Sequence, residues 1–564
     1  MTFPDVTSLI ASHIRKALDG LGFSVDSFSL EHPADVAFGD YATNVALVVA
    51  HRTQQTPRAV ADAIVRALPP IEWVDRIEIA GPGFINFYLS RSFFVSCVDS
   101  VIADRGSWGR NGLELNEEVL FEYTSPNLFK PLHVGNLVGN IIGESLSRLH
   151  EFSGATVRRI NYPSDIGLTV AKGVWGIMKT NGNPDVIDDL GSAYIAGNNA
   201  YESGGDEKNE IEAVNRALYA GTDERLNAIR DRGIQTSRAR ISQLCSLLGT
   251  SFDKEIFESQ AAIPAVTVVQ SALASGVFEK SDGAVVYHGE RIGLHTRVFL
   301  NSQGLPTYEA KDLGNFKIKQ DYYPDWTRCV VVTGSEQKEY FKVVIAAICD
   351  VFPDARNKSI EHVPTGFLTL TTGKMSSRKG NVLTGESLIE QLRTEALERA
   401  KDTRTDNVAR LADVIAVGAL KYQILRQKVG TNIIFDKQQA LSFEGDSGPY
   451  LQYTHARTVS VLEKADSVHL APSTAHSPEH PYPIERLLYQ FPEVTQRALS
   501  ENSPHYIVSF LSELAGMYNA FYALERIADV RDEYAPYKIA LTDAVRATLA
   551  QGLYVLGIEA PDKM

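Results

Sequence analysis

The stretch Pro131-Leu132-His133-Val134-Gly135-Asn136-Leu137 decides the fold of the chain around it. Upstream, residues 119–123 form a short run of β-forming residues, and downstream apolar residues recur at helical spacing until Ser153-Gly154. A second β-like run, residues 157–160, follows directly. This order of strand, loop, helix, glycine and strand predicts a βαβ unit. Such a unit builds a parallel sheet with its ligand site at the carboxyl end of the first strand.

His133 and Asn136 fall where the helix of this unit is expected to begin. Unpaired backbone N–H groups and the positive end of the helix dipole gather there, and Gly135 lets a planar or anionic ligand approach the backbone closely. The pattern therefore predicts an anion-binding site. The alternative is a histidine that only caps the helix and packs, and a short match taken alone favours that alternative.

A second candidate for anion binding lies much later in the chain. The run Gly373-Lys374-Met375-Ser376-Ser377-Arg378-Lys379-Gly380 places three cations and two serine hydroxyls between two glycines. Such a run can be a solvated surface turn, but its charge and its hydroxyl donors also suit a polyphosphate. The sequence thus offers two separated segments for one phosphate ligand.

Together, the two segments resemble the paired signature motifs of the class I aminoacyl-tRNA synthetases. Ser125-Pro126-Asn127 and Lys130, which precede His133, narrow the resemblance to the arginyl-tRNA synthetase family. The chain departs from that family in three places: Asn136 replaces a second histidine, Ile166 replaces a tryptophan, and the second motif reads Lys-Met-Ser-Ser-Arg. An asparagine amide still donates a hydrogen bond but carries no charge.

The resemblance covers nearly the whole chain and implies an α/β protein. A Rossmann-like catalytic domain with a parallel sheet is expected between an N-terminal α+β module and a C-terminal α-helical bundle. Residues 284–287, 298–300 and 329–334 are expected to complete the sheet, the last as a strand buried on both faces. The expected domains are residues 1–112 (the N-terminal module), 113–370 (the catalytic domain, with a solvated helical insertion at 180–283), 371–436 (the signature loop and a helical stem) and 437–564 (the anticodon-binding bundle).

Composition is ordinary for a soluble protein of several domains. The chain has 564 residues, 44% hydrophobic and 22% charged, and its net charge of −14 argues against a general nucleic-acid coat while permitting RNA binding where cations cluster. The four cysteines are scattered without a C-x-x-C pair, which argues against disulfides and cysteine zinc sites and favours the cytoplasm. Apolar runs are too short to cross a bilayer, and residues 1–20 do not read as a secretory signal.

Tyr308 and Asp312 stand four residues apart, so they share one face of a helix. Taken alone, such a pair lies at the surface or forms a local hydrogen bond. Selection of arginine, however, requires a carboxylate matched to a planar guanidinium with five donors. The resemblance implies that Asp312 and Glu122 hold the guanidinium and that Tyr308 walls the pocket. The residues implied at the α-amino and carboxylate end of arginine are Ser125, Asn127 and Gln337.

The resemblance further implies that the enzyme activates L-arginine with ATP and transfers it to tRNA(Arg). The arginine carboxylate attacks the α-phosphate and expels pyrophosphate, so the protein supplies positioning and positive charge rather than a nucleophile. Mg²⁺ accompanies ATP, and no structural metal is expected. Catalytic roles are implied for Lys130, His133, Asn136, Lys374, Arg378 and Lys379. Contacts to ATP are implied for Pro131, Leu132, His133, Val134, Gly135, Asn136, Lys374, Met375, Ser376 and Ser377.

Two further segments are implied to contact tRNA. The strings Gly39-Asp40-Tyr41-Ala42-Thr43-Asn44 and Gly81-Pro82-Gly83-Phe84-Ile85-Asn86 resemble the family's N-terminal domain, which contacts the tRNA elbow; the alternative is a packing appendage. Exposed aromatic rings stack on unpaired bases, and amides read base edges. The candidate contacts are Phe38, Tyr41 and Asn44, together with Gln452, Tyr453 and Arg457, for which core packing is an equally good explanation.

Two other functions fit parts of the sequence. One is a class I synthetase for another amino acid, against which Glu122 and Asp312 argue. The other is a non-catalytic paralogue that binds RNA, which would not need to keep His133 and Lys374. The resemblance therefore implies a cytoplasmic, monomeric arginine–tRNA ligase without membrane contacts, whose partners are tRNA(Arg), L-arginine and ATP.

Overall fold

The computed structural model describes residues 5–371, 384–399 and 407–564. Its internal contacts divide the chain into two compact units, one made of Met1–Gly109, Thr454–Glu493 and Glu513–Gln551, the other of Arg110–Tyr453, Val494–Ser512 and Gly552–Met564. The second signature segment lies outside the described residues. The predictions that fall on it are those for Lys374, Met375, Ser376, Ser377, Arg378 and Lys379.

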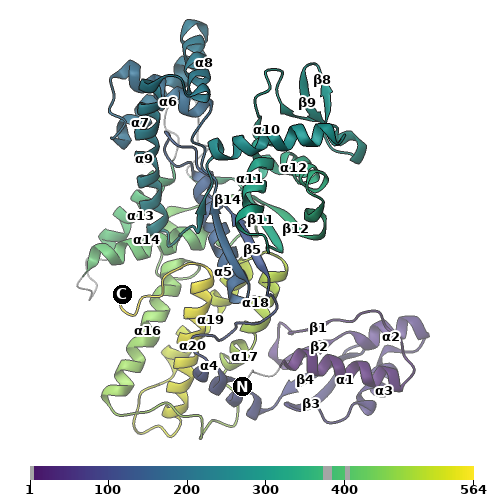
Figure 1. The fold of residues 1–564 in the computed structure, drawn as a ribbon. Helices are drawn as coiled ribbons and strands as arrows, with labels where there is room; N and C mark the ends of the chain where they lie inside the picture. Colours follow the sequence, from purple (N-terminus) through teal and green to yellow (C-terminus); the bar gives the residue numbers. More distant parts are fainter. Residues whose placement is uncertain (1–4, 372–383, 400–406) are drawn as a thin grey trace. The chain divides into compact units, whose positions relative to one another are not determined.

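The first unit begins with the predicted α+β module, whose antiparallel sheet has the strand order β1-β2-β4-β3. The helices start where capping residues allow: Asp5 accepts a hydrogen bond from the N–H of Ser8, and Pro57 occupies the first turn of α3. The elements, drawn in purple to dark blue in Figure 1, are α1 (Val6–Gly20), β1 (Leu30–Glu31), η1 (Val36–Phe38), β2 (Tyr41–Thr43), α2 (Val45–Thr53), α3 (Pro57–Ala67), β3 (Val74–Ala80), β4 (Phe84–Leu89) and α4 (Arg91–Ala103).

The C-terminal part is helical, as predicted. Within the first unit, α4 is tied to this part by Arg91, which donates to the carboxylate of Glu485 at 2.6 Å. The helices are α16 (Gly448–Ser467), α17 (Glu485–Leu488), α18 (Phe491–Ser500), α19 (His505–Leu524) and α20 (Ala535–Val555). Within the described residues, no helix is long and apolar enough to cross a membrane.

The second unit is built on a five-stranded parallel sheet with the order β12-β11-β5-β6-β7. The predicted βαβ unit is confirmed as β5 (Glu118–Glu122), α5 (Val134–Phe152) and β6 (Thr156–Asn161). Cys329–Val332 of β11 are all buried, as a central strand requires. The remaining strands are β7 (Lys254–Glu255), β11 (Arg328–Gly334) and β12 (Ser359–Thr365).

Three helices pack on one face of this sheet. Leu120, Cys329 and Val331 share a hydrophobic core with apolar residues of these helices, which are α10 (Glu258–Ala274), α11 (Tyr308–Tyr322) and α12 (Lys338–Val351). α5 contacts β11 closely enough that a Cβ at Gly139 would lie 3.8 Å from the carbonyl oxygen of Val332. The loops that leave the carboxyl ends of the strands are thereby held in place.

The predicted helical insertion is present, but the chain returns to the sheet before its predicted end at residue 283. The insertion has its own hydrophobic core, formed by α6 (Leu168–Thr180), α7 (Ile187–Ser203), α8 (Gly205–Ala220) and α9 (Glu224–Leu247), which Figure 1 shows as one group. β7 then pairs with β6.

One prediction about the sheet was wrong. Residues 284–287 and 298–300 do not join the parallel sheet; they belong to β9 (Ala284–Tyr287) and β10 (Arg297–Leu300), which form a separate antiparallel sheet with β8 (Glu279–Ser281). The connections between these strands are too short for the crossover that parallel neighbours need. Beyond β12, β13 (Leu368–Leu370) pairs in parallel with β14 (Ile433–Phe435), and the stem helices are α13 (Gly385–Arg399) and α14 (Val408–Leu425).

Candidate active site

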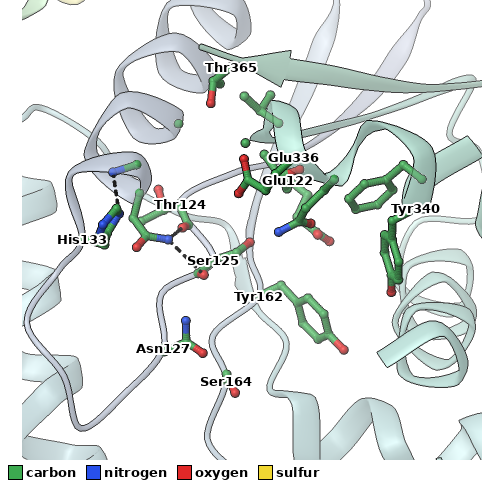
Figure 2. A pocket seen from close by; sticks show the side chains of 18 of the residues that line it. Glu122, Thr124, Ser125, Asn127, His133, Tyr162, Ser164, Glu336, Tyr340 and Thr365 are labelled. Atoms are coloured by element: carbon green, nitrogen blue, oxygen red, sulfur yellow. Dashed lines mark hydrogen bonds between the residues drawn. The ribbon is translucent and has the colours of Figure 1, made fainter. Parts of the chain in front are cut away.

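A cavity of about 660 Å³ opens at the carboxyl ends of the parallel strands. Figure 2 shows that His133 and Tyr340 lie on opposite sides of it, with Glu122 and Tyr162 between them. The cavity brings together eleven of the residues that the sequence singled out: Glu122, Ser125, Asn127, Lys130, His133, Val134, Gly135, Asn136, Tyr308, Asp312 and Gln337. It has the size and the convergent polar groups of a small-molecule site.

His133 is the N-cap residue of α5, and its Nδ1 accepts a hydrogen bond of 3.0 Å from the backbone N–H of Gly135. The neutral ring therefore carries its proton on Nε2. Partial burial and the nearby charge of Lys130 lower the pKa of His133, and the carboxylate of Glu336 only partly opposes them. The capping role is thus present, but it uses one ring nitrogen and leaves Nε2 as a neutral donor at neutral pH.

Asn136 lines the cavity, but the donor of its amide is used within the protein. Its Nδ2 donates to the backbone carbonyls of Thr124, at 2.7 Å, and Ser125, at 3.3 Å. Both acceptors have left-handed backbone, with φ of +76° at Thr124 and +40° at Ser125, a conformation that costs about 1–2 kcal/mol per residue. Asn136 thus holds the strained turn that carries Ser125 and Asn127 into the cavity, while its contact with ATP stays a prediction.

Asn136→Ala is therefore expected to act on arginine rather than on ATP. Loss of the two hydrogen bonds frees a strained turn and should lower kcat/KM for arginine about tenfold, with KM for ATP nearly unchanged. Asn136→Asp keeps the shape but lacks the donor, so it should behave alike in steady-state aminoacylation. A variant with normal arginine kinetics and impaired use of ATP would restore the phosphate role instead.

Glu122 ends β5 inside the protein, with 4% of its surface exposed. Its Oε2 is bound by Lys319 Nζ at 2.5 Å and by Asn315 Nδ2 at 2.8 Å. Although burial disfavours the charged form of Lys319, the neighbouring Cys329, Glu122 and Asp312 hold its pKa above the ordinary value. Glu122 is thus an anion already paired with a buried cation.

Asp312 lies beside Glu122 and accepts a hydrogen bond of 2.6 Å from the hydroxyl of Tyr340. Burial raises the pKa of Asp312 to about 7, with help from the negative charge of Glu122, while Tyr340 and Lys319 act in the opposite direction. Near neutral pH the carboxyl therefore exists in both protonation states. Such a group strongly favours the arrival of a cation.

Two further lysines line or approach the cavity. Lys311 forms an ion pair with Glu258 at 3.0 Å, and its Nζ lies 5.2 Å from the centroid of the Tyr308 ring. Tyr308 is 64% exposed. Lys130 sits near His133, and burial together with the charge of Lys172 lowers its pKa. Among the described residues, the His133 end of the cavity therefore carries the cation of Lys130, which has no ion pair, and the carboxylate of Glu336, while the Asp312 end carries several carboxyl groups.

Described residues on both sides of the stretch 372–383 in the sequence lie at this cavity or contact His133. Phe367 and Leu368, shortly before it, line the cavity. Directly after it, Thr384 pairs with His133 as an isolated β-bridge, and the N–H of Gly385 donates to the carbonyl of Leu132 at 2.8 Å.

Two of the predicted RNA contacts are buried. Tyr41 is 1% exposed and donates to Glu493 at 2.7 Å, and Gln452 is 0% exposed and donates to the carbonyls of Val414 and Glu559. Because a buried ring cannot stack on a base and a buried amide cannot read a base edge, both predictions are corrected, and these residues belong to the interior.

The other predicted RNA contacts differ in their exposure. Phe38 is 52% exposed and Tyr453 38%. Asn44 accepts a hydrogen bond from the N–H of Ser29, and Arg457 donates to Asn519. Phe38 and Tyr453 therefore keep the surface that base stacking needs.

Sequence reasoning missed several residues of the Asp312 end. Tyr340 and Tyr162 line it, and Asn315, Lys319 and Lys311 hold its carboxylates. One signal was available: polar residues recur every three or four positions from Tyr308 to Lys319, which predicts a polar stripe on a helix. Among the described residues, no group of three or more His, Cys, Asp and Glu side chains is placed to hold a metal ion.

Known families and relatives similar to this chain cover nearly its whole length. Residues 98–437 match the family "tRNA synthetases class I (R), catalytic domain", residues 451–564 the "DALR anticodon binding domain" and residues 8–89 the "Arginyl tRNA synthetase N terminal domain". An arginine–tRNA ligase of Streptococcus thermophilus is 30% identical over 99% of both chains, and one of Oenococcus oeni is 28% identical over 99% of this chain and 100% of its own length.

Solved structures agree on the fold. The arginyl-tRNA synthetase of Thermus thermophilus superimposes with a TM-score of 0.79 at 24% identity over 98% of this chain and 99% of its own. That of Plasmodium falciparum superimposes with a TM-score of 0.81 at 19% identity over the full length of both. Together with the matched catalytic, anticodon-binding and N-terminal domains, these likenesses show that the chain belongs to the arginyl-tRNA synthetase family of class I.

Proposed function

We propose that this cavity activates L-arginine with ATP to arginyl-adenylate, releasing pyrophosphate, and then passes the arginyl group to the terminal adenosine of tRNA(Arg), releasing AMP; this is the reaction of an arginine–tRNA ligase. Relatives with that name match the chain along its whole length. The observation that supports the site is that one cavity reaches both His133 and Asp312. A phosphate-binding helix start and a carboxylate pocket are what the two substrates require.

ATP would bind at the His133 end, with Mg²⁺ entering as part of the substrate. Nε2 of His133 is free of the cap and can donate to a phosphate oxygen, and Lys130 supplies a positive charge nearby. Lys374, Arg378 and Lys379 would add further positive charge, which is supported by the bridge between His133 and Thr384, a described residue shortly after them in the sequence. Cationic side chains in contact with the pyrophosphate stabilise its negative charge as it departs.

Arginine would lie with its guanidinium toward Asp312 and Glu122. The free carboxylate oxygens there match the planar donors of a guanidinium, and the hydroxyl of Tyr340 fixes the orientation of Asp312. Ser125, Asn127 and Gln337 line the remaining part of the cavity, where the α-amino and carboxylate groups would be held. The arginine carboxylate is thereby directed toward the α-phosphate.

The direct test is the ATP-dependent attachment of labelled arginine to tRNA by the full chain. We expect arginine to be attached and the other amino acids to be rejected. Activation of a different amino acid would indicate another class I specificity. Binding of tRNA without any aminoacylation would indicate a non-catalytic RNA-binding protein.

Use of arginine is expected to weaken as the pH falls through about 7. Burial raises the pKa of Asp312 to about 7, so the carboxyl is ionised above that pH and protonated below it, and only the ionised form attracts a guanidinium. We expect kcat/KM for arginine to be constant above about pH 8 and to fall about tenfold per pH unit below about pH 6. A profile that stays flat between these values would contradict this assignment, and KM for ATP serves as the internal reference.

A further inference from the structure

One face of α11 carries an unusual series of polar side chains. Tyr308, Lys311, Asp312, Asn315 and Lys319 follow one another at intervals of one, three or four residues, so they form a stripe along one side of the helix. Lys311, Asn315 and Lys319 are each at most 4% exposed. Lysine is almost never buried unless it is paired, so this face has a role beyond packing.

At one end of the stripe, Asn315 and Lys319 both bind Glu122. Lys319 Nζ and Asn315 Nδ2 both bind Oε2, which leaves Oε1 for another donor. An ion pair at 2.5 Å between side chains that are 4% and 6% exposed cancels most of the charge of Glu122 as seen from the cavity.

At the other end of the stripe, Lys311 forms a second ion pair, with Glu258. Lys311 Nζ lies 3.0 Å from Glu258 Oε2 and also donates to the hydroxyl of Tyr219 at 3.0 Å. Asp312, between the two lysines on the same helix, has the hydrogen bond from Tyr340 but no ion pair within the described part of the chain. Of the three carboxyl groups at this end, two carry their own cation.

We propose that Lys319 is the positioning residue that sets the charge of the arginine pocket: by cancelling Glu122, it leaves Asp312 as the one carboxylate answered by the guanidinium of the substrate. This inference rests on the proposed function, because it assigns the guanidinium to this end of the cavity. In this proposal arginine is selected by charge balance, because the one negative charge of Asp312 that no lysine cancels is neutralised by the guanidinium of the substrate. Lys319 needs no contact with the substrate for this role.

Without the cation of Lys319, Glu122 and Asp312 would be two neighbouring carboxyl groups in a desolvated site. Such groups share a proton, and the upper apparent pKa of the pair rises. The pH below which arginine is poorly used should therefore move upward. The charged and titratable groups that face Asp312 are Glu122 on β5, Tyr162 after β6, Glu258 on α10, Lys319 on α11 and Tyr340 on α12.

The test is the pH profile of kcat/KM for arginine in aminoacylation by the full chain. For Lys319→Met we expect the midpoint to rise by at least about one pH unit, which lowers kcat/KM at pH 7 by at least about fivefold, while KM for ATP is unchanged. Lys319→Arg should keep the wild-type midpoint. Lys317→Met is the matched control, because Lys317 lies on the same helix but pairs with Asp321 on the surface.

The double variant Glu122→Gln/Lys319→Met separates charge from folding. Removing one partner of a buried pair is strongly destabilising, whereas neutralising both is tolerated far better. We expect the double variant to return to a midpoint near that of the wild type, since Asp312 is again the only uncancelled carboxylate. An unshifted midpoint in the single variant, or a shifted one in the double variant, would overturn the proposal. A wild-type chain that activates a different amino acid would instead overturn the proposed function.

Discussion

His133→Ala is expected to lower kcat for aminoacylation about ten- to a hundredfold while leaving KM for arginine nearly unchanged. The free Nε2–H faces the end of the cavity where the phosphates are assigned, and a hydrogen bond to a charged group contributes about 1.5–3 kcal/mol. Because this contact strengthens as charge develops on the phosphate, its loss appears in turnover. Single-turnover formation of arginyl-tRNA measures the effect directly.

A second variant separates this role from helix capping. His133 also accepts the N–H of Gly135, so alanine removes a cap worth about 0.5–2 kcal/mol. Serine is a good N-cap but is too short to reach a phosphate in place of the imidazole. His133→Ser should therefore keep the melting temperature of the wild type and lose turnover as alanine does. Recovery of turnover with serine would mean that His133 is only a cap.

Asp312→Asn is expected to have the largest effect on arginine itself, a loss of about 3 kcal/mol, or roughly a hundredfold, in kcat/KM for arginine. The amide cannot balance a guanidinium in a desolvated site, and it turns an N–H toward the arriving cation. The dependence on pH near 7 should disappear as well, because the titrating group is gone. Aminoacylation at several arginine concentrations and pH values measures both effects.

Two comparisons sharpen that prediction. Glu122→Gln should cost less than Asp312→Asn, because Lys319 already cancels the charge of Glu122. Asp321→Asn, an exposed change on the same helix, should leave arginine kinetics intact. Equal losses for Asp312→Asn and Asp321→Asn would show that the effect comes from the helix rather than from the pocket.

Sequence alone predicted the parts of the fold that depend on local order. The run from residue 119 to residue 160 contains a strand, a helix start with glycine, a helix stop and a second strand, and each of these signals is local. Residues 284–287 and 298–300 were correctly predicted as strands but assigned to the wrong sheet. A short apolar run shows that a strand forms, not which strand it pairs with.

Residues that line the cavity were predictable where they belong to a motif, and not where a side chain acts on the protein itself. The sequence around His133 predicts anion binding, and the resemblance predicts that Asp312 binds a guanidinium. Asn136 instead holds backbone strain at Thr124 and Ser125, which is invisible before φ angles are known. Lys319 pairs with Glu122, which lies far earlier in the sequence, so no local pattern predicts the contact. Tyr41 and Gln452 are polar side chains in the interior, where hydrogen bonds rather than exposure explain them.

The central claim is that one cavity receives ATP at His133 and arginine at Asp312. A crystal structure with a non-hydrolysable analogue of arginyl-adenylate tests it most directly. The account predicts that the group replacing the phosphate lies within hydrogen-bonding distance of His133 Nε2, and that the guanidinium contacts Asp312. A guanidinium bound away from α11, or an adenylate group remote from the start of α5, would contradict it.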